Sequence, residues 1–256
     1  MKHLRESVKL NLLAQPSSNY KSKKNIKLGY HTYFLSLAHS DISGYNVCSM
    51  ANRLSIKEDN KNKSSCSSVC VAYNGNAQRF PKIMKSRIKK TKLFYENRSL
   101  FMQLLIKDIF KAIEFSKEHQ KICTFRLNAY SDIKWEFIKV TYNNKIYKNI
   151  FELFSEYTFY DYTKISNRIT PKNYQLTYSY YGNNKYFKDV LKTDQNIAIV
   201  FDKLPKKYAG RKVVNAVEND LRLKENDGIK VIAGLEFKGS KKALNNAIKE
   251  GFTIQI

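Results

Sequence analysis

Long apolar runs are absent from this 256-residue chain. No stretch of about 18 or more apolar residues occurs, which excludes the apolar helix that a membrane span requires. The first residues, MKHLRESVKLNLLAQPSS, also lack the continuous apolar stretch of a secretory signal. We therefore expect a cytoplasmic protein.

Acidic residues are scarce. Asp and Glu total 22 against 46 Lys and Arg, which gives a net charge of +24. A polyanionic partner accounts for this excess, because phosphates attract such a surface and release counterions on binding. Codon bias of an AT-rich genome is the alternative explanation. No basic amphipathic helix stands out, so a membrane surface is not the expected partner. We expect nucleic acid, with DNA favoured over RNA.

Several motifs of nucleotide and nucleic-acid enzymes are missing. The chain has no G-x4-GK[ST] loop, which argues against a P-loop nucleotidase. It has no histidine–hydrophobe–histidine motif of rolling-circle nickases and no H-x-E with P-C-x2-C deaminase signature. No histidine pair has metalloenzyme spacing.

Cysteine occurs only four times, and three of the four lie within 23 residues: Cys48, Cys66 and Cys70. Three thiolates on one loop suit zinc or an iron–sulfur cluster. The loop follows the first predicted strand, where radical-SAM barrels hold their cluster, although the C-x3-C-x2-C spacing is not present. Buried thiols without metal are the alternative, and Cys123 is expected in the core.

Apolar segments alternate with helical or loop segments along most of the chain. A very basic helix is predicted over about 78–97, and an amphipathic helix over about 99–119. Eight strands are predicted at 31–38, 123–128, 157–160, 174–178, 197–201, 212–215, 230–235 and 252–256. Gaps of this length favour crossover connections and a parallel sheet.

This pattern predicts an α/β fold. We expect a (β/α)8 TIM-like barrel that is irregular in its second half, with an open α/β sheet as the alternative. Residues 1–28 are polar and basic and are expected to form an N-terminal arm. Residues 29–256 would form one catalytic domain, with an inserted Cys-containing loop at 40–77.

Carboxylates follow several of the predicted strands. Asp132 and Asp161 each come just past a strand, and Asp220 lies in Glu218-Asn-Asp-Leu-Arg222. Carboxyl ends of parallel strands carry the active site in α/β folds, so these groups are catalytic candidates. Converging carboxylates serve glycosyl chemistry or hold Mg²⁺ for phosphodiester chemistry. Pairing with the abundant Lys and Arg is the structural alternative.

Gly234-Leu-Glu-Phe-Lys-Gly-Ser240 joins a predicted strand to a predicted helix. Backbone N–H groups at the start of that helix would point at an anion, so this turn is a candidate phosphate site. A helix cap after a tight turn is the alternative.

The order of these motifs resembles the phage gene product 88 family. The segments that carry the resemblance are Cys48 with Cys66–Cys70, Tyr73 and Gly75, then Arg126-Leu-Asn, Tyr160-Asp-Tyr-Thr-Lys164, Leu176-Thr-Tyr-Ser179, Glu218-Asn-Asp-Leu-Arg222 and Gly234-Leu-Glu-Phe-Lys-Gly239. Cys70-Val-Ala-Tyr73 departs from the Cys-Tyr-Ala of that family. The resemblance implies a phage origin rather than a particular reaction. The substrate-binding candidates from the motifs and strand ends are Arg126, Asn128, Lys164, Ser179, Arg222, Gly234, Lys238 and Gly239.

The Phe159-Tyr-Asp-Tyr-Thr-Lys164 segment, with Arg168 beyond it, is also similar to the nucleophile segment of tRNA-guanine transglycosylases and their phage DNA-directed relatives. That resemblance implies exchange of guanine for a 7-deazaguanine by two aspartates, with Asp161 at C1′ of the sugar and Asp132 at the base. The zinc site of that family is absent. We expect base exchange or base excision on DNA, with a 7-deazaguanine-type base as a candidate substrate. A radical-SAM-like iron–sulfur enzyme acting on nucleic acid and a non-enzymatic DNA-binding protein are the alternatives.

Overall fold

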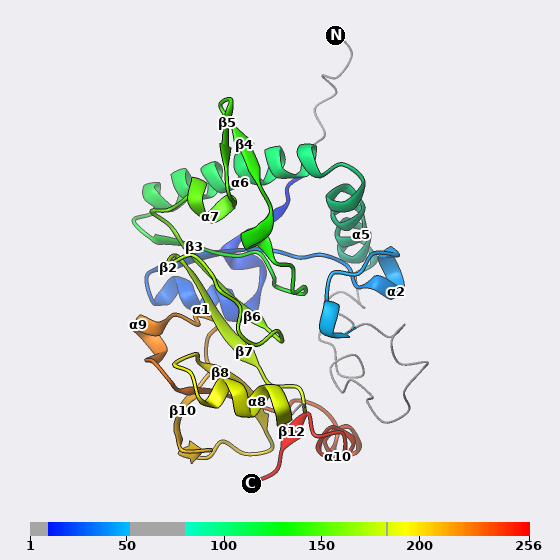
Figure 1. Ribbon diagram of the computed structural model, residues 1–256, viewed down its shortest axis with the longest axis vertical. Coiled ribbons are helices and arrows are strands. Elements are labelled where there is room, and N and C mark those ends of the chain that lie inside the picture. Colours follow the sequence, from blue (N-terminus) through cyan, green and yellow to red (C-terminus); the bar gives the residue numbers. More distant parts are fainter. Residues whose placement is uncertain (1–9, 52–79, 183) are drawn as a thin grey trace.

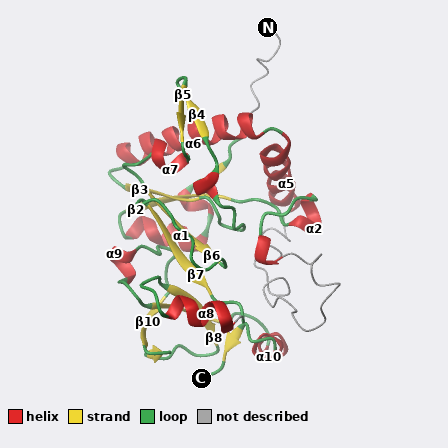
Figure 2. Ribbon diagram, viewed as in Figure 1, coloured by secondary structure: helices red, strands yellow, loops and turns green. Residues whose placement is uncertain are grey.

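A computed structural model describes residues 10–51, 80–182 and 184–256. Helices and strands alternate along the chain, and one large sheet runs the length of the molecule (Figure 1, Figure 2). Within the described ranges, no helix has the length and apolar character needed to cross a membrane.

The sheet is mostly parallel. The strands follow one another across it in the order β1 (Leu13–Ala14), β2 (Tyr30–Leu35), β3 (Ile122–Arg126), β6 (Thr158–Thr163), β7 (Tyr174–Ser179), β8 (Ile197–Phe201), β11 (Ile232–Glu236), β10 (Arg211–Asn215) and β9 (Lys207–Tyr208). β12 (Thr253–Ile254) pairs with the end of β8. The strands from β2 to β10 in this order are parallel to their neighbours, whereas β1 and β9 are antiparallel. All eight predicted strands are present, and the parallel arrangement matches the expectation from their spacing.

The sheet is open over the described residues. Its path ends at β1 and β9, and no pairing joins these two edges. The open α/β sheet therefore fits, and the closed (β/α)8 barrel is not seen in this part of the chain. One reason is the segment 216–223, hereafter the crossing segment, which runs from β10 back over the sheet. Its Leu221 and Leu223 pack on Tyr160 of β6. In a closed barrel, the strands on the opposite side would cover this face of the sheet. Here the crossing segment covers it instead.

The helices cover both faces of the sheet. α5 (Pro81–Glu96) and α6 (Arg98–Glu118) match the two predicted helices closely. The alternation of side chains along β2 and β3 sends Tyr33 and Phe125 into the core shared with α6, and sends Thr32 to the opposite face. There, Asn25 of α1 (Tyr20–Lys27) donates a hydrogen bond to Thr32. The described part of the expected arm at 1–28, residues 10–28, thus forms β1, a 3₁₀ turn at Pro16–Ser18 and α1 on the sheet.

The remaining elements are short, and some of them contribute buried side chains. α8 (Asn184–Leu191) packs its Val190 with Ile197 and Ile199 of β8 in a second apolar cluster. β4 (Val140–Tyr142) and β5 (Lys145–Tyr147) form a two-stranded hairpin that projects beyond α6 (Figure 1). Its turn contains two asparagines with positive φ. The short helices are α2 (Ser40–Ser43), α7 (Ile150–Leu153), α9 (Lys224–Asp227) and α10 (Lys241–Lys249).

A candidate active-site pocket at the carboxyl ends of the strands

A pocket of about 420 Å³ lies where six parallel strands end. Its walls include one residue from the end of each of these strands or just beyond it: Phe34, Arg126, Lys164, Ser179, Val200 and Leu235. Ligand sites of α/β proteins form at this edge because the loops that follow the strands converge there. The volume falls in the range of small-molecule sites.

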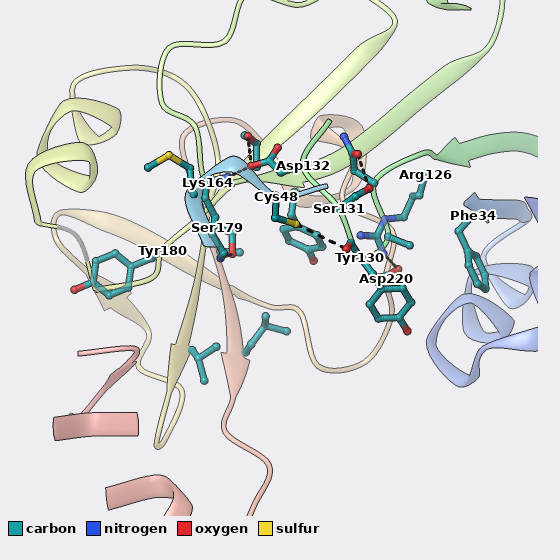
Figure 3. A pocket seen from close by; sticks show the side chains of 18 of the residues that line it. Phe34, Cys48, Arg126, Tyr130, Ser131, Asp132, Lys164, Ser179, Tyr180 and Asp220 are labelled. Carbon is teal, nitrogen blue, oxygen red and sulfur yellow. Dashed lines mark hydrogen bonds and ion pairs between the residues drawn. The ribbon is translucent and has the colours of Figure 1, made fainter. Parts of the chain in front are cut away.

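Seven residues predicted for the site from sequence line this one pocket: Cys48, Arg126, Asn128, Asp132, Lys164, Ser179 and Asp220. Figure 3 shows six of them, with Arg126 beside Asp220 and Lys164 beside Ser179. They come from five segments of the chain. The strand order brings three of these segments together, because β3, β6 and β7 are neighbours in the sheet.

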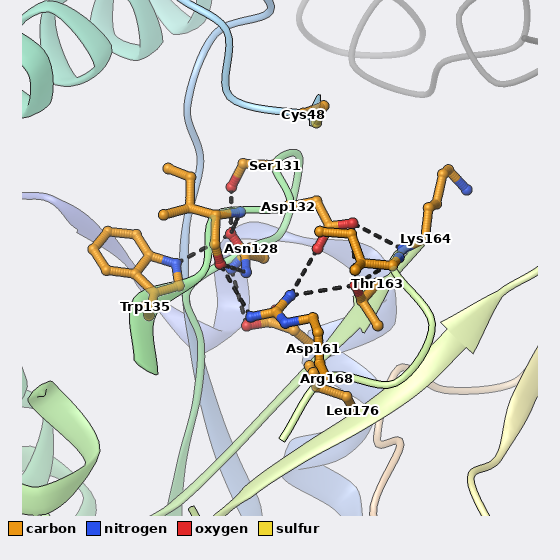
Figure 4. Close-up of polar contacts among 12 residues, drawn as sticks. Cys48, Asn128, Ser131, Asp132, Trp135, Asp161, Thr163, Lys164, Arg168 and Leu176 are labelled. Carbon is orange, nitrogen blue, oxygen red and sulfur yellow. Dashed lines mark hydrogen bonds and ion pairs between the residues drawn. The ribbon is translucent and has the colours of Figure 1, made fainter. Parts of the chain in front are cut away.

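Asp132 is held rigidly at the pocket wall. One carboxylate oxygen accepts hydrogen bonds from the Thr163 hydroxyl at 3.1 Å and from the Lys164 backbone N–H at 2.8 Å. The other lies 2.8 Å from a guanidinium nitrogen of Arg168 (Figure 4). Arg168 also pairs with Glu136 at 2.7 Å. Burial raises the pKa of Asp132, and these hydrogen bonds and Arg168 oppose that rise. The residue is thus fixed in orientation while its proton is retained more readily than in water.

Asp220 is the most exposed of the three predicted catalytic aspartates. Its side chain is 18% exposed, against 8% for Asp132 and 0% for Asp161. One carboxylate oxygen is paired with a terminal nitrogen of Arg126, and its backbone N–H donates to Asn25 at 3.3 Å. Because α1 and the crossing segment both contribute, Asp220 reaches the pocket only when these two elements dock.

Asp161 does not line the pocket. β6 extends to Thr163, so Asp161 lies within the strand and not beyond its end as the sequence suggested. β3 and β6 pair only at Thr124–Thr158 and Phe125–Phe159, and beyond that point the Asp161 carboxylate accepts hydrogen bonds from the Leu127 and Asn128 N–H groups, each at 3.0 Å. The side chain thus replaces the missing strand ladder, since buried backbone N–H groups require acceptors.

The burial of Asp161 also changes the pKa of its carboxyl group. Burial raises its pKa to about 7, against the opposing effects of Arg126, whose Nε lies 3.6 Å away, and of the two backbone donors. Arg126 therefore bridges a sealed aspartate and a pocket aspartate, and its guanidinium also lies 5.1 Å from the centre of the Tyr162 ring.

Asn128 organises the loop that carries Asp132. Its side-chain oxygen accepts hydrogen bonds from the Ser131 hydroxyl at 2.8 Å, the Ile133 N–H at 3.0 Å and the Trp135 indole at 3.1 Å (Figure 4). Its amide nitrogen donates to the Ile133 carbonyl at 2.9 Å. The residue predicted to bind substrate is thus largely occupied in shaping the pocket wall.

Four other predicted binding residues do not line the pocket. Arg222 is buried and pairs with Asp227 at 3.3 Å. Gly234 lies inside β11, where an added Cβ would come within 2.6 Å of Val213 and 2.7 Å of Leu204. This glycine serves close strand packing. Lys238 and Gly239 follow β11 in the exposed turn before α10, where the Ser240 hydroxyl accepts a hydrogen bond from the Ala243 N–H. That hydrogen bond is the helix cap considered as the alternative for this turn.

Only one of the three clustered cysteines is described. Cys48 lines the pocket, and its Sγ donates to the Tyr130 carbonyl at 3.8 Å. Cys66 and Cys70 lie outside the described residues. Within the ranges given above, no group of three or more metal-ligating side chains is assembled. Cys123 is buried in β3 as expected, and burial raises its pKa to about 12.

Several pocket residues were not among the predicted site residues. Lys21 and Asn19 come from the expected arm, and Phe34, Tyr162 and Tyr180 add aromatic rings. The aromatic residues lie in or next to predicted strands, so their contribution follows once the strand ends are known. The sequence marks Lys21 only as one lysine of a basic arm, because its position in the pocket depends on how α1 docks.

The comparison with protein families shows which family the chain belongs to. The sequence profile described as Gene product 88 matches residues 10–255. The chain belongs to the gene product 88 family. The match spans the described sheet and every segment that lines the pocket. Neither the comparison with curated proteins nor that with solved structures gives a match.

Proposed function

We propose that this gene product 88 protein is an enzyme that cleaves the N-glycosidic bond of a nucleoside in DNA and exchanges or removes the base. The observation that supports this most is the pocket itself. It combines two carboxylates, Asp132 and Asp220, with aromatic walls and cations at the active edge of an α/β sheet. The net charge of +24 supports a polyanionic substrate.

The pocket suits a nucleotide that has been taken out of the base stack. Enzymes that act on a base in DNA extrude it into a pocket that holds it between aromatic and apolar side chains. Phe34, Tyr130, Tyr162 and Tyr180 supply such rings. The apolar floor comes from Ala198 and Val200 of β8 and from Leu235 of β11.

The two pocket aspartates take different roles in this proposal. Asp220, the more exposed carboxylate, attacks or stabilises C1′ of the sugar as the bond from C1′ to the base nitrogen breaks. Asp132 hydrogen-bonds the base and exchanges a proton with it, a role that suits a carboxyl group whose pKa is raised by burial. Asp161 is a positioning residue that holds Arg126 and the end of β3, because its own carboxylate is sealed from the pocket.

A base-release assay tests this proposal. Purified protein is incubated with a duplex oligonucleotide carrying base label, with and without a free 7-deazaguanine base, and the released base is measured by chromatography. We expect release that Asp220→Asn and Asp132→Asn each reduce by about a hundredfold or more. Asp194→Asn, a matched change at a 77%-exposed carboxylate, should leave release unchanged. Absence of release, with DNA binding intact, would instead support a non-enzymatic DNA-binding protein.

The position of Cys48 favours a second candidate, a radical-SAM-like iron–sulfur enzyme acting on nucleic acid. Cys48 lines the pocket, so a cluster or zinc ion held with Cys66 and Cys70 would lie near the substrate. The readout is the iron, sulfide and zinc content of protein purified without oxygen. Iron and sulfide that are retained by Cys123→Ala and lost in Cys48→Ala would support this candidate, whereas zinc alone or metal-free protein would reject it.

A further inference from the structure

Lys21 brings a positive charge into one end of the pocket. It is the second residue of α1, and both it and the capping residue Asn19 line the pocket. The Asn19 side chain accepts the Lys21 N–H at 2.9 Å, which fixes the start of the helix. The Lys21 ammonium donates to the Ala216 carbonyl of the crossing segment at 3.3 Å. The lysine is thus held by a backbone oxygen at the pocket wall.

Positive charge is in excess around this lysine. Burial is the main cause that lowers the pKa of Lys21, and Arg222, Lys238 and Arg126 lower it further, whereas Asp220 opposes them. The carboxylates near this end already have arginine partners, since Asp220 and Asp161 pair with Arg126 and Asp227 pairs with Arg222. In the part of the chain that the structure describes, Lys21 forms no ion pair of its own.

Arg126 brings a second positive charge to the same place. The residue is 8% exposed and lines the pocket. One terminal nitrogen is paired with Asp220, and Nε lies 3.6 Å from the sealed Asp161 carboxylate. The guanidinium is thus fixed at the pocket wall, on the side where Lys21 lies.

We propose that Lys21 and Arg126 form a phosphate-binding subsite at the α1 end of the pocket. Phosphate oxygens would accept from the Lys21 ammonium and from the Arg126 guanidinium, which are both charged donors that line the pocket. The start of α1 adds a favourable helix dipole. This subsite is distinct from the phosphate site that the sequence suggested at Gly234–Ser240, whose Gly234, Lys238 and Gly239 do not line the pocket.

The inference deepens the proposed function, because it names the part of the nucleotide that this end of the pocket recognises. It does not require that any bond be cleaved. The phosphate could belong to a free nucleotide or to the strand of a nucleic acid, and the two sources share the same chemistry.

Calorimetric binding of defined probes tests the subsite. The first probes are the four deoxynucleoside 5′-monophosphates, each compared with its nucleoside. The second probes are short single strands, each compared with the same strand carrying one neutral methylphosphonate. We expect one of these two phosphate classes to bind at least about tenfold more tightly than its neutral counterpart. Preference for the monophosphates assigns a free nucleotide, and preference for the charged strand assigns a phosphodiester.

Variants then locate the phosphate. Lys21→Gln should abolish the preference and Lys21→Arg should retain most of it. Lys192→Gln, which removes the same charge from a side chain that is 78% exposed, should leave it intact. Equal binding of charged and neutral probes, or a preference that survives Lys21→Gln, would overturn the subsite. Because base release is measured separately, phosphate binding without base release would reject only the proposed reaction.

Discussion

Three aspartates that look alike in the sequence have three different environments in the structure. Asp161 is sealed within the sheet, Asp132 is clamped by Arg168, and Asp220 is partly open to the pocket. The sequence placed Asp161 at the end of its strand because the apolar run stops at Tyr160. The strand continues through Tyr162, whose ring faces Arg126, and this extension could not be read from hydrophobicity alone.

Asp161→Ala should therefore damage stability. The substitution leaves the Leu127 and Asn128 N–H groups without their acceptor and removes one carboxylate beside buried Arg126. We expect a loss of about 3–5 kcal/mol in the free energy of unfolding, measured with urea. Asp194→Ala, at an exposed site, should change it by less than about 0.5 kcal/mol. A loss of that small size for Asp161→Ala would contradict the role given to this residue.

Lys90 predicts a pH dependence of stability. Its ammonium is buried and donates to the Leu12 carbonyl at 2.8 Å, and burial lowers its pKa to about 8. The unfolded chain releases this proton only near pH 10.4. Between these values the unfolded state binds more protons, so the stability contributed by this group rises with pH.

The comparison is wild type against Lys90→Met. The difference in their free energies of unfolding should shift in favour of the wild type between about pH 8 and pH 10.4, by up to about 1.4 kcal/mol per pH unit. A difference that stays constant over this range would mean that the pKa of Lys90 is the same in the folded and unfolded states.

Most secondary-structure elements could be predicted from the sequence. Those that were missed are short or exposed. The apolar positions of α6 recur at helical spacing, and Leu105, Ile109 and Ile113 are buried as that spacing requires. β1 and β9 have two residues each, too few for a periodic signal. The β4–β5 hairpin was missed because its strands are short and mostly exposed, although its Asn143-Asn144 turn is a recognisable signal.

At β11, the structure predicts a packing role for a glycine. Gly234→Ala should lower the free energy of unfolding by about 1–3 kcal/mol, because the new methyl group would overlap Val213 and Leu204. Nucleotide binding per folded molecule should not change. Weakened phosphate binding by a fully folded Gly234→Ala protein would instead support a phosphate site at the Gly234–Ser240 turn.

The predicted basic helix is a second element with a testable role. On α5 the side chains of Lys82, Lys85, Lys89 and Lys92 are exposed. In the same helix Lys90 is buried, and Arg87 lies 4.1 Å from the ring centre of Tyr130, which lines the pocket. α5 therefore presents a row of lysines on its exposed face, roughly opposite to the side on which Arg87 contacts Tyr130.

Replacing these four lysines with glutamine should weaken binding to duplex DNA and reduce the slope of log K against log salt by up to about 3–4. The control removes the same charge from exposed lysines elsewhere: Lys145, Lys148, Lys172 and Lys192. Equal effects of the two quadruple variants would mean that DNA binds through overall charge and not through α5.

For the whole molecule, composition and strand spacing predicted the α/β class and the parallel sheet, but not whether the sheet closes. Closure depends on which strands meet at the edges, and β10 follows β11 in the sheet although it precedes it in sequence. The crossing segment then uses Ala216, against Ala198 and Ala233, to lie close to the sheet face. Such long-range packing produces no periodic pattern in the sequence. It nevertheless places Asp220 at the pocket.

The central claim is that the pocket aspartates act on bases in DNA. The most direct measurement is mass spectrometry of nucleosides from the DNA of cells that express the protein and are supplied with 7-deazaguanine precursors. We predict a new nucleoside or abasic sites that disappear with Asp220→Asn and persist with Asp194→Asn. Unchanged nucleosides and no abasic sites in cells that contain the folded protein would contradict the claim.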